Sequence, residues 1–168
     1  MPQPIQLTTH FTLADFHKGG PIPDSYIPIY TELAVRILEP VRTEFAKPIE
    51  ITSGYRSLKE NTAAHGQPNS EHMATTFMCA CDFYIEGIGM RFVFDWMRNN
   101  PFLPYHQLIL ESDASGISII HVSLNKMMPG TRSVLIGATH NTTPYAKVDH
   151  VAYAPDDQQD VDSREQTA

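Results

Sequence analysis

The residue types that could do chemistry are concentrated in one short stretch of the sequence, NSEHMATTFMCACDF, at residues 69–83. It contains His72, two cysteines and Asp82, and a further histidine, His121, lies within the apolar run SIIHVSL. Imidazole, thiolate and carboxylate groups are the side chains that bind zinc in proteins. The stretch therefore raises the question of a metal site and of which side chains would be its ligands.

The expected strands direct His121 and Asp82 away from the hydrophobic core. Alternate residues of a β-strand share a face, and the face opposite His121 is purely apolar, as is the face opposite Asp82. Two strands that each present one ligand, with His72 on a preceding loop, would form a His2Asp site with one position left for water, which is typical of catalytic zinc. On this pattern alone, a strand histidine that is merely hydrogen-bonded remains the alternative.

Composition limits the classes of partner. The chain has 168 residues, of which 42% are hydrophobic, so it is long enough for one domain with a real core. A net charge of −7 argues against nucleic acid or an anionic membrane surface as partner.

The sequence has no apolar run long enough to span a membrane and no secretory signal, so we expect synthesis in the cytoplasm. We expect residues 1–154 to form the domain and the acidic residues 155–168 to be a disordered tail.

The order of periodic segments predicts an α+β fold, with helices packed on a small, mostly antiparallel sheet. Apolar residues recur every four positions from Ile29 to Phe45, which indicates a helix that Pro40 should kink or divide. Ser57 and Glu60 have the spacing of a capping box at the start of a second helix. We expect a third helix ending near residue 100, and strands at 49–53, 80–87, 105–112, 116–125 and 132–138, the third and fourth of which form a hairpin.

The order of the motifs resembles a known family. ITSGYRS at 51–57, GQPNSEH at 66–72, the aspartate of CACDF, HQLILE at 106–111 and IHVSL at 120–124 are similar to motifs of the zinc peptidoglycan peptidases. These include D-Ala-D-Ala carboxypeptidases and phage L-alanyl-D-glutamate endopeptidases, and the likeness is strongest to a short, phage-associated branch. It extends from about residue 7 to residue 124.

The resemblance assigns roles to individual residues. It implies that His72, Asp82 and His121 bind Zn²⁺, that Arg56 binds a substrate carboxylate, and that Ser70 belongs to the same pocket. A planar guanidinium is well suited to a carboxylate, since it can donate two parallel charge-assisted hydrogen bonds. Zinc in such a site lowers the pKa of bound water and polarises the scissile carbonyl.

Two features depart from the family pattern. Asp82 follows His72 by ten positions, where relatives usually have seven, and this longer loop brings Cys79 into consideration as a ligand in place of Asp82. Several relatives have an acid three residues before the last histidine, where this chain has Ser118. The resemblance then points to Glu111 as the general base, with Asp113 as the alternative. A glutamate that only solvates a strand end is the simpler interpretation of Glu111.

The other histidines receive weaker assignments. His106 begins the strand that carries Glu111 and is a candidate for a group that supports the site, whereas His65 is expected on a loop surface. His10, His17, His140 and His150 lie outside any evident constellation.

The sequence thus predicts a zinc peptidase acting on the stem peptide of bacterial peptidoglycan. We expect it to be phage-encoded, made in the host cytoplasm, and active at the bacterial cell wall or in the virion. The alternative is a non-catalytic copy of the fold that serves as a structural or wall-binding component of a phage particle and contacts other phage structural proteins. The longer ligand loop and Ser118 favour that alternative, whereas the presence of all three ligand types in order favours the enzyme.

Overall fold

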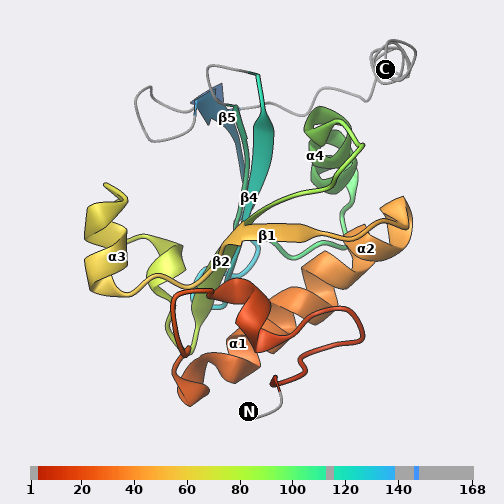
Figure 1. Cartoon of the computed structure of the whole chain (residues 1–168). Helices are drawn as coiled ribbons and strands as arrows, with labels where there is room; N and C mark the ends of the chain where they lie inside the picture. Colours follow the sequence, from red (N-terminus) through yellow and green to blue (C-terminus); the bar gives the residue numbers. More distant parts are fainter. Residues whose placement is uncertain (1–3, 113–115, 139–145, 148–168) are drawn as a thin grey trace.

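The computed structural model describes residues 4–112, 116–138 and 146–147 (Figure 1). Over these residues the strands form a single sheet in the order β1-β2-β4-β3-β5-β6. Its neighbouring strands are antiparallel except for β3 and β5, which are parallel. The strands are β1 (Glu50–Ser53), β2 (Met78–Tyr84), β3 (Gln107–Ser112), β4 (Ser118–Asn125), β5 (Ser133–Ala138) and β6 (Ala146–Lys147).

Helices pack on one face of this sheet, and the predicted α+β fold is confirmed. Figure 1 shows α3 on one side of the sheet and α1, α2 and α4 on the other. None of the helices in the described part of the chain has the length and apolar character needed to cross a membrane. The helical elements are η1 (Leu13–Phe16), η2 (Asp24–Tyr26), α1 (Ile27–Leu33), the π-helical segment Ala34–Leu38, α2 (Glu39–Phe45), α3 (Leu58–Ala63), η4 (Glu71–Met73) and α4 (Met90–Asn99).

The first long helix runs through Pro40 because its middle turn is widened. The segment Ala34–Leu38 is π-helical and joins α1 directly to α2. Four residues of an α-helix turn by about 40° more than one full circle, so a strict four-residue apolar repeat would drift around the helix. In a π turn each hydrogen bond spans five residues instead of the four of an α-helix, so the wider turn offsets this drift. The four residues of the repeat that precede Phe45 are therefore all buried, namely Ile29, Leu33, Ile37 and Val41.

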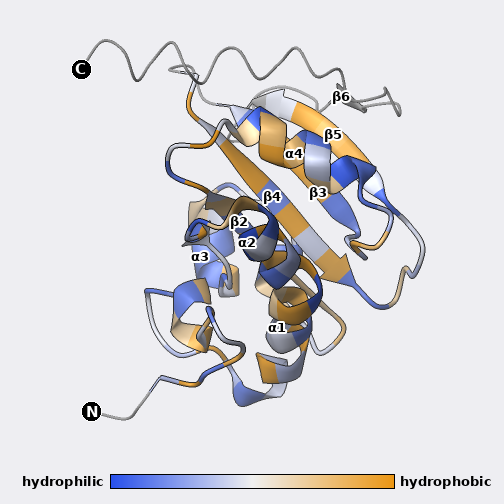
Figure 2. Ribbon diagram, turned by 90° about the vertical axis from the view of Figure 1, so that its right-hand side faces the viewer, coloured by the Kyte–Doolittle hydropathy of each residue, from blue (hydrophilic) through white to orange (hydrophobic). Residues whose placement is uncertain are grey.

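One hydrophobic cluster joins this helix and α4 to the sheet. Its sheet residues alternate along the strands as predicted, and Figure 2 shows polar residues interrupting the apolar colour of β4. Full burial of an aliphatic side chain contributes about 1.5–3 kcal/mol relative to exposure. The apolar face of the sheet therefore holds the sheet against these helices. The strand residues involved are Ile51, Cys79, Cys81, Phe83, Leu108, Leu110, Ile120, Val122 and Leu124.

Several predicted local elements are confirmed. The capping box of α3 is present, because the Ser57 hydroxyl accepts from the amide of Glu60 while the Glu60 carboxylate accepts from the amide of Ser57. β3 and β4 form the predicted antiparallel pair, and α4 ends at Asn99. The predicted tail, 155–168, and part of the predicted domain, 1–154, lie outside the described residues.

Candidate metal centre

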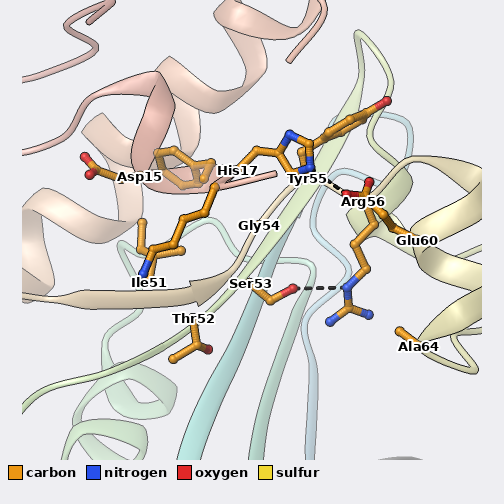
Figure 3. Close-up of a pocket in the computed structure, with 12 residues that line it drawn as sticks. Asp15, His17, Ile51, Thr52, Ser53, Gly54, Tyr55, Arg56, Glu60 and Ala64 are labelled. Atoms are coloured by element: carbon orange, nitrogen blue, oxygen red, sulfur yellow. Dashed lines mark hydrogen bonds and ion pairs between the residues drawn. The ribbon is translucent and has the colours of Figure 1, made fainter. Parts of the chain in front are cut away.

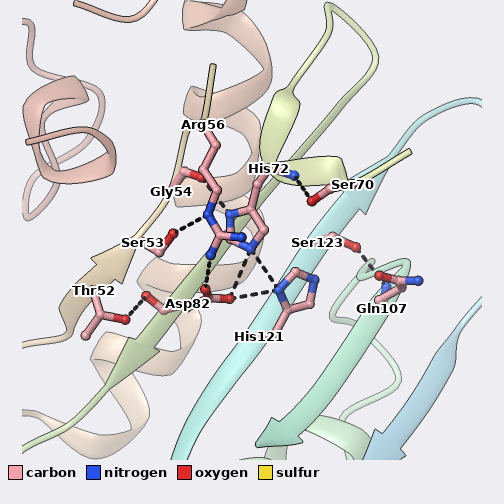
Figure 4. Close-up of polar contacts among 10 residues, drawn as sticks. All are labelled: Thr52, Ser53, Gly54, Arg56, Ser70, His72, Asp82, Gln107, His121 and Ser123. Carbon is pink, nitrogen blue, oxygen red and sulfur yellow. Dashed lines mark hydrogen bonds and ion pairs between the residues drawn. The ribbon is translucent and has the colours of Figure 1, made fainter. Parts of the chain in front are cut away.

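Three side chains converge on one point of the polar face of the sheet (Figure 4). The Nε2 atom of His72 lies 3.2 Å from Oδ1 of Asp82 and 3.1 Å from Nδ1 of His121. The Nδ1 atom of His121 lies 2.8 Å from the same oxygen of Asp82. All three residues are buried. The structure therefore brings together the three side chains that the sequence had suggested as ligands.

The sheet fixes two members of this group. Asp82 of β2 and His121 of β4 are direct partners across the antiparallel pair, so their side chains leave the same face side by side. The strand alternation assumed from the sequence is therefore correct.

The third member, His72, is held by backbone contacts around η4. Its Nδ1 atom lies 2.6 Å from the carbonyl oxygen of Gly54, and its own carbonyl accepts from the amide of Arg56 at 2.8 Å. Because the carbonyl of Gly54 can only accept, Nδ1 must carry the proton, and Nε2 directs its lone pair at Asp82 and His121. Such a contact to the second ring nitrogen is the usual way in which a metal-binding histidine is oriented.

Gly54 itself permits this arrangement. A Cβ atom at position 54 would collide with the backbone of Phe16, whose carbonyl accepts from the amide of Tyr55 at 2.8 Å. The close approach of these two segments therefore requires glycine.

The donor set fits a zinc ion. Zinc bonds to nitrogen and oxygen of about 2.0–2.1 Å in a tetrahedral arrangement place the ligand atoms about 3.3 Å apart. The three separations found here, 3.2, 3.1 and 2.8 Å, are close to that value. When both imidazoles are neutral, their two ring nitrogens and the carboxylate oxygen of Asp82 present lone pairs to the same point, which a cation would satisfy together.

Electrostatics within the group favour an ionised aspartate. Burial acts to raise the pKa of Asp82, but its electrostatic interactions with His72 and His121 outweigh burial, so the pKa lies far below the usual range. Burial acts to lower the pKa of His121, but the hydrogen bond to Asp82 and the charges of Asp82, Glu111 and Glu71 raise it overall. The carboxylates of Asp82, Glu111 and Glu71 thus all act on the ring of His121, and their negative charge favours a cation at this position.

The loop between His72 and Asp82 leaves both residues in contact with His121. Its last part is a compact turn in which the Thr75 hydroxyl accepts from the amides of Phe77 and Met78, and the amide of Thr75 donates to the carbonyl of Met78. This turn leads directly into β2, the strand that carries Asp82.

The alternative ligand, Cys79, points in the opposite direction. It lies on the core face of β2, with its sulfur 3.6 Å from the carbonyl oxygen of Ile29. Burial raises the pKa of both Cys79 and Cys81 well above the ordinary value. The two cysteines are free thiols and are small, fully buried residues of β2.

Arg56 lies against the candidate ligands. Its Nη2 atom is 3.2 Å from Oδ2 of Asp82, and its Nε donates to the hydroxyl of Ser53 at 3.0 Å. A β-bulge in β1 displaces Thr52, whose hydroxyl donates to the carbonyl of Asp82 at 3.2 Å. Bulges of this kind redirect neighbouring side chains, and here Ser53 comes to face the guanidinium.

A pocket of about 270 Å³ opens beside Arg56 (Figure 3). Its wall combines β1 and the following loop with the end of η1, the two residues after it, and Glu60 and Ala64 from α3 and its C-cap. His17 lines it, with Nε2 2.9 Å from the carboxylate of Glu60 and its ring edge-on to Tyr55. The sequence gave no sign of this role, because His17 and Glu60 are 43 positions apart.

The remaining predicted residues lie around the centre. Ser70 caps η4, where its hydroxyl accepts from the amide of His72 at 3.4 Å. Glu111 is on β3 and shares a face with Ile109, the direct partner of His121, and its charge contributes to the raised pKa of His121. Asp113 lies outside the described residues. The roles of Ser70 in substrate binding and of Glu111 as a base stay predictions.

His106 does support the neighbourhood of the site, as the sequence suggested. Its Nδ1 atom lies 2.8 Å from the carboxylate of Glu71, which precedes His72. Glu71 itself was not singled out from the sequence. His65 is exposed on a loop, as expected.

Comparison with known proteins agrees with this geometry. A family described as Peptidase M15 matches residues 12–122, a range that contains every described residue of the candidate site discussed above. A search of curated proteins found no match. The match covers well over half of the chain, and the chain therefore belongs to the Peptidase M15 family of metallopeptidases.

Proposed function

We propose that this protein is a zinc-dependent peptidase that hydrolyses the stem peptide of bacterial peptidoglycan. The observation that carries the proposal is the convergence of His72, Asp82 and His121 within 4.8 Å of one another, buried, in a Peptidase M15 domain. Three protein ligands leave a coordination position for water, as in catalytic zinc sites. The motif resemblance supports peptidoglycan as the substrate and Zn²⁺ as the ion.

The residues around the centre have complementary tasks. Zinc, when bound by the three ligands, supplies an acidified water and polarises the scissile carbonyl. Glu111, on the same face of the sheet as His121, takes the proton from the attacking water and delivers it to the leaving amine. Arg56, which is partly exposed beside the pocket, binds a carboxylate of the stem peptide through its remaining donors, and Ser70 adds a hydroxyl to the same region.

The biological setting follows from the same resemblance. We propose that the protein is phage-encoded, is made in the host cytoplasm and acts at the bacterial cell wall, either as an endolysin or as a component of the virion beside other phage structural proteins. The acidic composition, with a net charge of −7, supports a partner other than nucleic acid or an anionic membrane.

Two measurements on the same preparations test the proposal. Elemental analysis of protein purified without chelator should give about one zinc per chain, and His121→Ala should lose it while His65→Ala, at an exposed loop position, keeps it. Purified peptidoglycan and synthetic stem peptides should then be cleaved by the wild type and not by His121→Ala, with mass spectrometry of the fragments locating the bond. A wild type that takes up no zinc even after its addition would overturn the proposal and leave the non-catalytic wall-binding module.

A further inference from the structure

The turn that carries His72 also carries a buried glutamate. Glu71 is only 8% exposed and lies in η4, immediately before His72. Glutamate is rarely buried unless its charge is paired or hydrogen-bonded. Its position beside a candidate ligand therefore calls for a physical reason.

The contacts of Glu71 join η4 to the ends of two strands, β3 and β4. Its Oε1 atom accepts from the Nδ2 of Asn125 at 2.7 Å and lies 2.8 Å from the Nδ1 of His106. Asn125 is the last residue of β4, the strand that carries His121, and His106 directly precedes β3. The residue next to His72 is thereby attached to the strand of a second ligand.

The two sides of η4 are anchored independently. On one side, His72 contacts Gly54 through its ring and Arg56 through its carbonyl, which attaches η4 to the loop after β1. On the other side, Glu71 attaches it to the ends of β3 and β4. A three-residue helical turn has little rigidity of its own, so two anchors on opposite sides determine where the imidazole of His72 lies.

We propose that Glu71 is a positioning residue that fixes His72 for metal binding, through its shared contact with His106 and Asn125. This inference rests on the proposed function, because it concerns the same metal centre. The Oε2 atom of Glu71 is buried and has no hydrogen-bond partner among the described residues. Burying a carboxylate here therefore costs folding free energy, which packing alone does not explain. Groups that orient metal ligands typically alter metal affinity about 10- to 100-fold when they are removed.

The test measures zinc affinity separately from folding stability. Zinc affinity would be determined by competition with a chromophoric chelator, and the geometry of the site by the visible absorption of the Co²⁺-substituted protein. Glu71→Ala should weaken zinc binding about 10- to 100-fold and change the Co²⁺ spectrum. Glu71→Gln, whose amide oxygen can still accept from both neighbours, should recover most of the affinity.

Asp95 provides the matched control. It is also a buried acid, it pairs with Arg91 and Arg98 at 2.8 and 3.0 Å, and it belongs to α4, which has none of the candidate ligands. Asp95→Ala should lower thermal stability while leaving zinc affinity and the Co²⁺ spectrum unchanged. Should Glu71→Ala fail to fold, Asn125→Ala removes one of the two donors and should weaken zinc binding to a smaller degree.

The possible results separate the two proposals. Equal zinc affinity in the wild type and in Glu71→Ala, or in the wild type and Asn125→Ala if that variant is used, would overturn this inference alone. An equal loss of affinity in Asp95→Ala would also overturn it, since the effect would then be one of general destabilisation. A wild type that binds no zinc would overturn the proposed function and this inference with it.

Discussion

Arg56 contacts the oxygen of Asp82 that the two histidines leave free. Its Nη2 atom lies 3.2 Å from Oδ2, whereas Oδ1 lies 2.8 Å from His121 and 3.2 Å from His72. One oxygen of the carboxylate thus pairs with the guanidinium of Arg56, and the other faces the point where a metal ion would bind. This division favours binding of the ion through one oxygen and places a guanidinium beside the reacting groups.

Arg56→Ala should lower kcat/KM for stem peptides about 10- to 100-fold, since a hydrogen bond to a charged group typically contributes about 1.5–3 kcal/mol. Arg56→Lys should recover only part of the loss, because an ammonium cannot reproduce the planar pair of donors. Steady-state kinetics would give the ratio. Arg36→Ala, at an exposed helix position paired with Glu32, is the control, and cleavage by Arg56→Ala at the wild-type rate would refute the carboxylate anchor.

Glu111→Gln should lower the cleavage rate about 100- to 10,000-fold, the usual contribution of a general base, while zinc content stays at the wild-type level. The amide has the shape of the carboxylate but cannot take the proton. Single-turnover rates together with elemental analysis would show both effects. If Asp113→Asn, measured alongside, lost activity and Glu111→Gln did not, the base would be Asp113.

Zinc should stabilise the wild type and not His121→Ala. A ligand that binds only the folded state adds about 2.7 kcal/mol to the free energy of unfolding when its free concentration is 100 times its Kd. Thermal unfolding with zinc and with excess chelator would measure the difference. A zinc-dependent shift that persisted in His121→Ala would show that the ion binds elsewhere on the chain.

Cys79→Ala should leave zinc content unchanged and lower the free energy of unfolding by about 1 kcal/mol, as is usual for a point substitution in a packed interior. The thiol is fully buried on the core face against Ile29 and does not face Asp82. Urea unfolding and elemental analysis of the same sample would check both statements. Loss of zinc with stability retained would restore Cys79 as a ligand.

The stability contributed by Glu60 should depend on pH. Hydrogen bonds from the Ser57 hydroxyl, from His17 and from the Ser57 amide lower the pKa of Glu60 from 4.5 to about 2. A lowered pKa in the folded state means that the unfolded state binds more protons, so the contribution is complete above pH 4.5 and is lost as the pH falls toward 2. The difference in unfolding free energy between wild type and Glu60→Gln, both measured in chelator, should shrink over that window. A constant difference would contradict the assignment.

The parts of the fold that were predictable depend on local pattern. The alternation around His121 and the capping box at Ser57 act over a few residues, so the strand face and the start of α3 follow from the sequence. The parallel pairing of β5 with β3 depends on a chain reversal that no short pattern encodes. Where a kink or two abutting helices were expected around Pro40, the structure has two α-helices joined by a π-helical segment, whose widened turn no short pattern in the sequence indicated.

The candidate site divides in the same way. The motif order and the strand faces identified His72, Asp82 and His121, since each residue type carries its own chemistry. Of the groups that hold them in place, the sequence pointed only to His106. The carbonyl of Gly54 lies 18 positions from His72, and Asn125 lies 54 positions from Glu71. Such contacts arise only when distant segments pack together.

Gly54 has a consequence for how variation in this chain should be interpreted. Its missing side chain admits the backbone of Phe16, and its carbonyl holds the ring of His72. In a library of variants selected only for correct folding, with no demand for catalysis, position 54 would therefore still be restricted to glycine. Intolerance to mutation at this position would therefore reflect the close packing of two backbone segments. Residues identified as sensitive to mutation would then include some that support the site without touching substrate.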